Sequence, residues 1–169
     1  MMESKIRPLR NLLVVVAVAL LTAACAQSPV APDGMEVTAY GPAHVLSGEA
    51  IAGDRVVWGG RIVAIDNLAE HTELIVASYP LDRADRPRIR EQAGVRFVLV
   101  EERFLEPVEW RPGRYVTVLG TVEGIEERAT GEYVHPHPVL RAENLHLWPA
   151  DPAQWQSRTG FSLGVGIRL

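Results

Sequence analysis

The chain has only one cysteine and one lysine among its 169 residues. Cys25 has no partner for an intrachain disulfide, so packing alone must hold the fold together. Lys5 lies near the amino terminus, and every later fixed cation is an arginine. Acidic residues outnumber basic ones, 21 against 17. Because nucleic-acid binding depends on clustered Lys and Arg, this balance counts against a nucleic-acid partner.

The chain has a single long apolar run, Leu12 to Leu21, and it lies close to the start. Lys5, Arg7 and Arg10 precede it, and small residues follow it, which is the pattern of a secretory signal. The run is shorter than the roughly 20 residues that a membrane-spanning helix needs. Residues 1–24 are therefore predicted to be a signal peptide, whose removal moves the formal charge from -4 to about -6.

The segment Leu21-Thr22-Ala23-Ala24-Cys25 resembles the lipobox of bacterial lipoproteins. The resemblance implies cleavage before Cys25, a diacylglycerol on its thiol, and acylation of the new amine. Several acyl chains, each gaining about 0.8 kcal/mol per buried methylene, would anchor the protein in a lipid bilayer. The alternative is an ordinary cleaved signal with an incidental cysteine. Ala26, in place of the aspartate that commonly retains such proteins at the inner membrane, implies an outer-membrane address.

The remaining 145 or so residues suit one domain. We expect a lipidated flexible tether over 25–34, a β-barrel domain over 35–150, and a carboxyl-terminal extension over 151–169. The extension alternates large apolar with small or polar residues after Gly160, which predicts an edge strand within the barrel or one added to a partner's sheet.

Short strand-like runs separated by turn signals predict an all-β fold. Tyr115 to Glu123 is the clearest, because its valines alternate with polar residues. Gly59-Gly60 inside another run indicates a sharp bend or bulge. The expected strands are 55–65, 72–79, 96–101, 115–123, 138–141 and 145–148. We predict a small OB-like barrel of five to seven strands, with a β-sandwich as the alternative.

Helical signals are few. Residues 82–92 could hold one or two turns of helix, with Asp85 as a cap before Pro87. The fold class therefore includes at most one short helix.

Catalytic patterns are missing from the sequence. It has no Gly-x-Ser-x-Gly elbow, and Gly59-Gly60 lacks the lysine and spacing of a phosphate loop. Its adjacent carboxylate pairs would face opposite sides of a strand. We expect a protein that is not an enzyme and carries no cofactor. A hydrolase would need a pocket with converging polar groups.

Two kinds of side chain are candidates for binding. His135 and His137 share one face of an extended segment, but zinc normally takes at least three protein ligands, so they are weak metal candidates. Trp58 and Trp148 have apolar neighbours and are expected in the core. Trp110 and Trp155 lie beside polar or proline-rich segments and are the candidates for exposed ligand contacts.

An ordered set of segments resembles the Slp family of outer-membrane lipoproteins. It runs from about Tyr40 to Trp148 and includes Val57-Trp58-Gly59-Gly60-Arg61-Ile62, Tyr79-Pro80-Leu81-Asp82 and Gly113-Arg114-Tyr115-Val116. The resemblance implies a periplasm-facing lipoprotein of the outer membrane, associated with starvation or stress. We expect envelope support or an interaction role with an envelope protein or glycan. The alternative is an OB-type module that binds glycan or lipid fragments.

Overall fold

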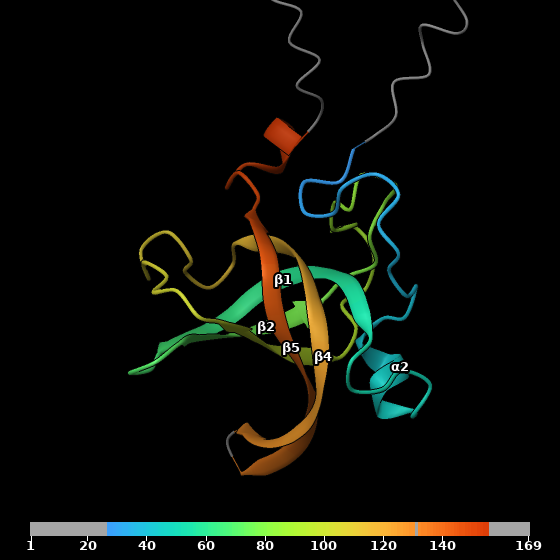
Figure 1. Cartoon of the computed structure of the whole chain (residues 1–169). Helices are drawn as coiled ribbons and strands as arrows, with labels where there is room; N and C mark the ends of the chain where they lie inside the picture. Colours follow the sequence, from blue (N-terminus) through green and yellow to red (C-terminus); the bar gives the residue numbers. More distant parts are fainter. Residues whose placement is uncertain (1–26, 131, 156–169) are drawn as a thin grey trace, which may run out of the picture.

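The computed structural model describes residues 27–130 and 132–155 (Figure 1). The elements in chain order are α2 (Pro42–Leu46), β1 (Arg55–Asn67), β2 (Thr72–Ser78), β3 (Arg96–Glu101), β4 (Tyr115–Thr130), β5 (Tyr133–Leu147) and the 3-10 turn η1 (Pro152–Trp155). The predicted signal peptide, Cys25 and the tail strand after Gly160 lie outside the described residues. Within those residues, no helix has the length and apolar character that crossing a membrane requires.

The five strands close into a barrel with the order β1-β2-β3-β5-β4. Neighbours are antiparallel except β3 and β5, which pair in parallel from Val98 to Val100. The sequence predicted a small barrel of five to seven strands, and the closed barrel has five, so the OB-like fold class is confirmed. The sandwich alternative is wrong, because one sheet closes on itself.

Strand β1 is long enough to pair with two neighbours in succession. Its first half, Arg55 to Arg61, pairs with β4, and its second half, Gly60 to Asn67, pairs with β2. The change of partner falls at Gly60, where an added Cβ would lie 2.0 Å from the carbonyl oxygen of Ala77. The bend predicted from the glycine pair is therefore confirmed.

The main core lies inside the barrel and is built from alternate residues of every strand. Phe97 and Trp58 pack edge to face, with ring centroids 5.1 Å apart. Its buried members are Val45, Ala50, Val56, Trp58, Ile62, Leu74, Val76, Phe97, Leu99, Leu105, Val116, Val118, Val122 and Leu140. The alternation predicted for Val116, Val118 and Val122 thus faces this core.

Strands β4 and β5 are longer than the sequence pattern indicated. The separate strands expected at 138–141 and 145–148 are one strand, and β4 continues beyond Glu123 to Thr130. Register shifts at Leu119/Gly120 and Val122/Gly124 let the pair curve away from the barrel as a hairpin. Pro136 and Pro138 fit there because a two-stranded hairpin leaves one backbone side free of ladder bonds.

The helix expected over 82–92 is absent, and that prediction is wrong. The carboxylate of Asp82 accepts hydrogen bonds from the backbone amides of Ala84 and Arg86, at 2.8 and 3.1 Å. A side chain that satisfies nearby amides in this way competes with the helical pattern. Asp85 then takes a left-handed φ of 56° and turns the loop back. The observed helix, α2, begins instead at Pro42, where proline suits the first helical turn.

The start of the described chain packs on the outside of the barrel. Val30 is 2% exposed, and its carbonyl accepts a hydrogen bond of 2.8 Å from the side-chain amide of Asn144. The hydroxyl of Ser28 accepts hydrogen bonds from the amides of Val30 and Ala31. Part of the segment expected as a tether therefore contacts β5, while the domain boundaries stay predictions.

The bend in β1 gives a stability prediction. Gly60→Ala should lower the free energy of unfolding by about 3 kcal/mol, because the backbone of Ala77 cannot yield without disrupting the β1–β2 ladder. Urea denaturation measures the loss. Gly41→Ala is the control, since its Cβ would meet its nearest atom at 3.8 Å, and it should cost less than about 1 kcal/mol. Equal losses in the two variants would contradict the steric explanation.

Candidate functional site

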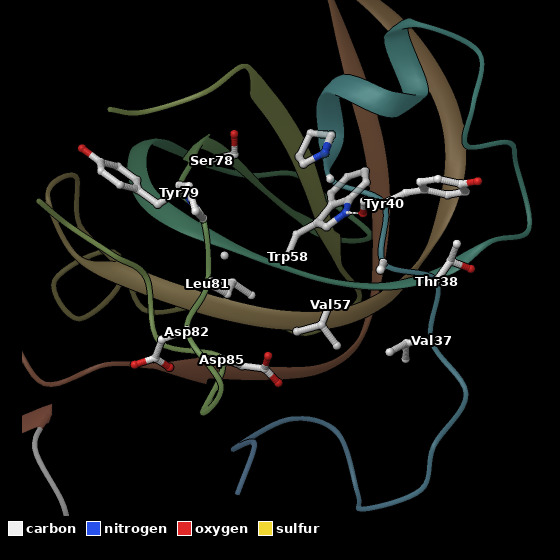
Figure 2. Close-up of a pocket in the computed structure, with 15 residues that line it drawn as sticks. Val37, Thr38, Tyr40, Val57, Trp58, Ser78, Tyr79, Leu81, Asp82 and Asp85 are labelled. Atoms are coloured by element: carbon white, nitrogen blue, oxygen red, sulfur yellow. Dashed lines mark hydrogen bonds between the residues drawn. The ribbon is translucent and has the colours of Figure 1, made fainter. Parts of the chain in front are cut away.

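A hollow of about 430 Å³ lies on the outside of the barrel over the first half of β1. The segment 37–42 forms one wall, and residues 78–82 with Asp85 form the other. Figure 2 shows Leu81 and Asp85 on one side of Val57 and Trp58, with Thr38 and Tyr40 on the other. The hollow is thus assembled from three segments that are far apart in the sequence.

The hollow exists because β1 has no neighbour along part of one edge. The carbonyl of Asp54 and the amide of Ile62 form hydrogen bonds on the β4 side. The backbone amides and carbonyls of the even-numbered residues between them therefore point toward β4. The backbone amides and carbonyls of the odd-numbered residues point away from β4. Strand β2 pairs with this side of β1 only from Gly60 onward. The first half of β1 therefore has an open edge.

Two contacts bracket this open edge. At one end the amide of Thr38 donates to the carbonyl of Arg55 at 2.8 Å, and at the other Tyr79 donates to the carbonyl of Gly59 at 2.9 Å. Between them lie the carbonyl of Val57 and the amide of Gly59. Neither group makes a hydrogen bond within the described residues. Both residues line the hollow, Val57 half-buried and Gly59 buried, so the strand has one acceptor and one donor without a partner there.

The floor of the hollow is apolar and fixed. Trp58 is 2% exposed and donates from its indole nitrogen to the carbonyl of Tyr40 at 2.7 Å. Leu81 lies directly over Gly59, where an added Cβ would approach the leucine to 2.8 Å. The half-buried Val57 completes the floor. A ligand here would bury apolar surface against side chains that are already in place.

The acidic wall contains two aspartates that differ in their hydrogen-bond and ion-pair partners. Burial alone raises the pKa of Asp82, but hydrogen bonds from the amides of Arg86 and Ala84 and from the Arg86 guanidinium outweigh it and lower the pKa. Arg86 also forms an ion pair with Asp82 at 2.8 Å. The half-buried carboxylate of Asp85 makes no hydrogen bond or ion pair in the described part of the chain. Among the described residues, Asp85 is therefore the carboxylate of the hollow that has no partner.

A chain of hydrogen bonds fixes the backbone at Asp85. Its carbonyl accepts from the Thr117 hydroxyl at 2.7 Å, and that hydroxyl accepts from the indole of Trp148 at 2.8 Å. Arg86 donates to the carbonyl of Trp155 at 3.1 Å. The positions of Asp82 and Asp85 are thus set by β4 and by the segment after β5.

The structure separates the four tryptophans by burial. Trp58 and Trp148 are 2% and 7% exposed, so both are buried; Trp58 lies in the main core as expected, whereas Trp148 packs against Trp155 and is not a member of that core. Trp155, expected to be exposed, is only 9% exposed, and that expectation is wrong. Its ring packs edge to face on Tyr115 of β4, with the centroids 5.2 Å apart. Trp110 is half-buried against the main core. The structure does not bring Trp110 and Trp155 to the hollow.

The two candidate histidines lie in the β4–β5 hairpin. His137 is 3% exposed, and its Nδ1 is 2.9 Å from the carbonyl of His135. Both line a second hollow, of about 450 Å³, together with Arg96. His146 is elsewhere, opposite Thr117, where burial lowers its pKa. No group of three metal-ligating residues is found among residues 27–130 and 132–155.

The surface that OB barrels commonly use for oligonucleotides or oligosaccharides is strands β2–β3 with the adjoining hairpin loops. Here the outward Val98 and Val100 of β3 form a second apolar cluster with Val139, packed against Ile75. The hairpin is tied across to β2 by Arg128, whose guanidinium bonds Glu73 at 2.7 and 3.0 Å. The chain itself therefore occupies part of this surface.

The hollow over β1 can bind and orient a ligand. It combines a backbone donor and acceptor, an apolar floor and one free carboxylate. Sequence reasoning missed Asp85 as a site residue because it was assigned to a helix cap. The open edge of β1 has no sequence signal, since it depends on where two other segments leave the strand.

A closed five-stranded barrel of this strand order defines the chain as a small OB-type β-barrel protein. The chain belongs to the outer membrane lipoprotein Slp family, whose model matches residues 22–162. This confirms the resemblance and the class of outer-membrane lipoprotein.

Similar proteins from two bacteria are consistent with this family assignment. The chain is 30% identical over 132 residues to the uncharacterized lipoprotein YeaY of Escherichia coli K12, covering 77% of this chain and 68% of the relative. It is 25% identical over 96 residues to the outer membrane protein Slp of the same strain, covering 57% and 50%. An uncharacterized protein of Haemophilus influenzae is 31% identical over 91 residues, covering 53% and 49%.

Solved structures similar to the chain include an OBody, AM3L09, bound to hen egg-white lysozyme. The TM-score is 0.37 at 14% identity, covering 69% of this chain and 96% of the other. For the mitochondrial single-stranded DNA binding protein Rim1 of S. cerevisiae, the TM-score is 0.33 at 17% identity, covering 57% and 96%. At these TM-scores the likeness carries no argument about ligands.

The contact between Arg128 of the hairpin and Glu73 of β2 predicts a stability that depends on pH. The hydrogen bond from Arg128, which is the largest cause, holds the pKa of Glu73 below its ordinary 4.5. Glu73 therefore contributes stability above about pH 4.5, and this contribution is lost as the pH falls through the lowered folded value. Glu73→Gln should cost about 1–3 kcal/mol at pH 7 and less at pH 3, measured by urea denaturation.

The matched control is Glu102→Gln, which removes an ion pair with Arg141 from a side chain that is 75% exposed. That change should stay within about 0.5 kcal/mol at both pH values. A Glu73→Gln loss that is equally large at pH 3 would show that the ion pair is not its cause.

Proposed function

We propose that the chain is anchored to the outer membrane by acyl chains on Cys25 and that its barrel faces the periplasm. There it acts as a non-enzymatic interaction module of the envelope. The observation that carries the interaction role is the open edge of β1, where a rigid apolar floor lies beside unused backbone groups.

The family match supports the anchor. The matched segment begins at residue 22, so it includes the small residues before Cys25 as well as the barrel. One relative is itself described as a lipoprotein and another as an outer membrane protein. Thioether formation needs a thiol, and Cys25 carries the only one in the chain.

The docking of Val30 supports a barrel held close to the bilayer. Only four residues separate Cys25 from Val30, whose side chain is buried against the barrel. An extended chain spans at most about 3.5 Å per residue, so the anchor lies within roughly 20 Å of this contact. The β4–β5 hairpin reaches away from the described amino-terminal end (Figure 1).

The geometry of the hollow favours binding over catalysis. Its polar groups without a hydrogen bond in the described residues are the Asp85 carboxylate, two backbone atoms of β1, and hydroxyls such as those of Thr38 and Tyr40. No nucleophile lies in hydrogen-bond contact with a base among its lining residues. The association with starvation or stress conditions draws on the family resemblance alone.

A second candidate function is the binding of glycan or lipid fragments. The apolar floor at Trp58, with Tyr40 and Tyr79 on the walls, favours it, because aromatic and apolar linings are typical of small-ligand sites.

The anchor has a direct test in cells grown with labelled palmitate. Cys25→Ser should abolish labelling and move the protein to the aqueous phase of a detergent partition, because the hydroxyl cannot form the thioether. Retained label in this variant would rule out Cys25 as the attachment site. Added protease should degrade the wild-type protein only after the outer membrane is permeabilised.

Ala26→Asp provides the matched control for sorting. It leaves Cys25 intact, so the palmitate label should persist while the protein moves to the inner-membrane fraction. A variant that stays in the outer membrane would contradict the sorting role of Ala26.

A further inference from the structure

The open edge of β1 has the geometry of a strand that lacks its partner. Val57 offers a carbonyl and Gly59 an amide on the same side, two residues apart. An extended peptide uses this donor and acceptor spacing when it adds to a sheet edge. A sugar or lipid fragment has no regular backbone to match it.

The length of the open edge sets the size of the occupant. The contacts of Thr38 and Tyr79 close it at both ends. At about 3.3 Å per residue, the gap from Val57 to Gly59 accommodates roughly two or three residues of an added strand. The apolar floor at Trp58 and Leu81 would then lie beneath the side chains of that segment.

The charge of the hollow favours a cationic side chain on the segment that occupies it. None of its lining residues is a lysine, an arginine or a histidine. Arg86 neutralises Asp82 through an ion pair at 2.8 Å, and Asp85 is left without a partner in the described residues. Because Asp85 is half-buried, a cation beside it would be less screened than one on an open surface.

We propose that this hollow binds a short extended segment of a partner protein that carries an arginine or lysine. The segment's backbone pairs with the carbonyl of Val57 and the amide of Gly59, and its cationic side chain pairs with Asp85. This inference rests on the interaction role proposed above and names the chemistry of the partner.

The test uses the mature lipidated protein, isotopically labelled, in detergent micelles. The probe is the peptide acetyl-Ser-Val-Arg-Val-Ser-amide, and a second peptide has glutamate in place of arginine. We expect the arginine peptide to shift the amide signal of Gly59 in the NMR spectrum and to bind at least fivefold more tightly than the glutamate peptide. No shift of Gly59 at millimolar peptide, or equal affinity for both peptides, would overturn the proposal.

Two variants separate charge from general packing. Asp85→Asn should weaken binding of the arginine peptide at least fivefold. Asp66→Asn makes the same charge change on an exposed residue of β1 outside the hollow, and it should leave the affinity unchanged. Equal effects of the two variants would contradict a specific role for Asp85.

A third peptide, N-methylated at the amides on either side of the arginine, keeps the charge but loses the backbone donors. It should lose at least fivefold in affinity, and unchanged binding would overturn the strand-pairing geometry. If diacetylchitobiose shifts the same amides and the arginine peptide does not, the hollow is a glycan site. If the arginine peptide binds only after removal of residues 156–169, the chain's own tail is the occupant. Either result would overturn the partner-peptide proposal while leaving the palmitate test of the anchor unaffected.

Discussion

The partner change in β1 is the constraint on which the rest of the structure depends. One strand must pair with β4 over its first half and with β2 over its second, and only a residue without Cβ fits where it crosses Ala77. This crossing closes the barrel. It also leaves the first half of β1 without a partner on one side, because β2 has already diverged there. Closure of the core and the open edge are thus two results of one bend.

The loop that contains Asp85, beside this edge, is stabilised by residues far away in the sequence. Asp85 has a left-handed backbone, which costs energy for a residue with a side chain and persists only where the surrounding structure holds it. Here the fixing atom is the hydroxyl of Thr117, whose own partner is the indole of Trp148. The segment after β5 therefore has a structural role at the edge of β1. It stabilises a loop whose carboxylate lines the hollow beside β1.

The sequence predicted those features that depend on local pattern. Strands β1 to β3 lie within two residues of their expected bounds, and Gly59-Gly60 marked the bend, because side-chain alternation and glycine act locally. Around Pro136 the sequence predicted only an extended segment, with a strand from Pro138, whereas the structure has one continuous strand there, because a free backbone side tolerates both prolines. The burial of Trp155 and the role of Asp85 were missed because both depend on segments that meet only in the folded barrel. Side-chain capture of amides by Asp82 likewise overrode the helix signal.

A short segment of chain joins the proposed anchor at Cys25 to the hollow. The segment after Val30 runs directly into residues 37–42, which form one wall of the hollow and contact β1 at Thr38. With Val30 docked by Asn144, this wall has little freedom to move with the bilayer. A partner bound at β1 would therefore keep a fixed position relative to Val30, and the β4–β5 hairpin points away from the described amino-terminal end (Figure 1). With the proposed anchor on Cys25, this arrangement would limit how far a bound partner lies from the membrane, because an extended chain spans at most about 3.5 Å per residue between Cys25 and the docked Val30.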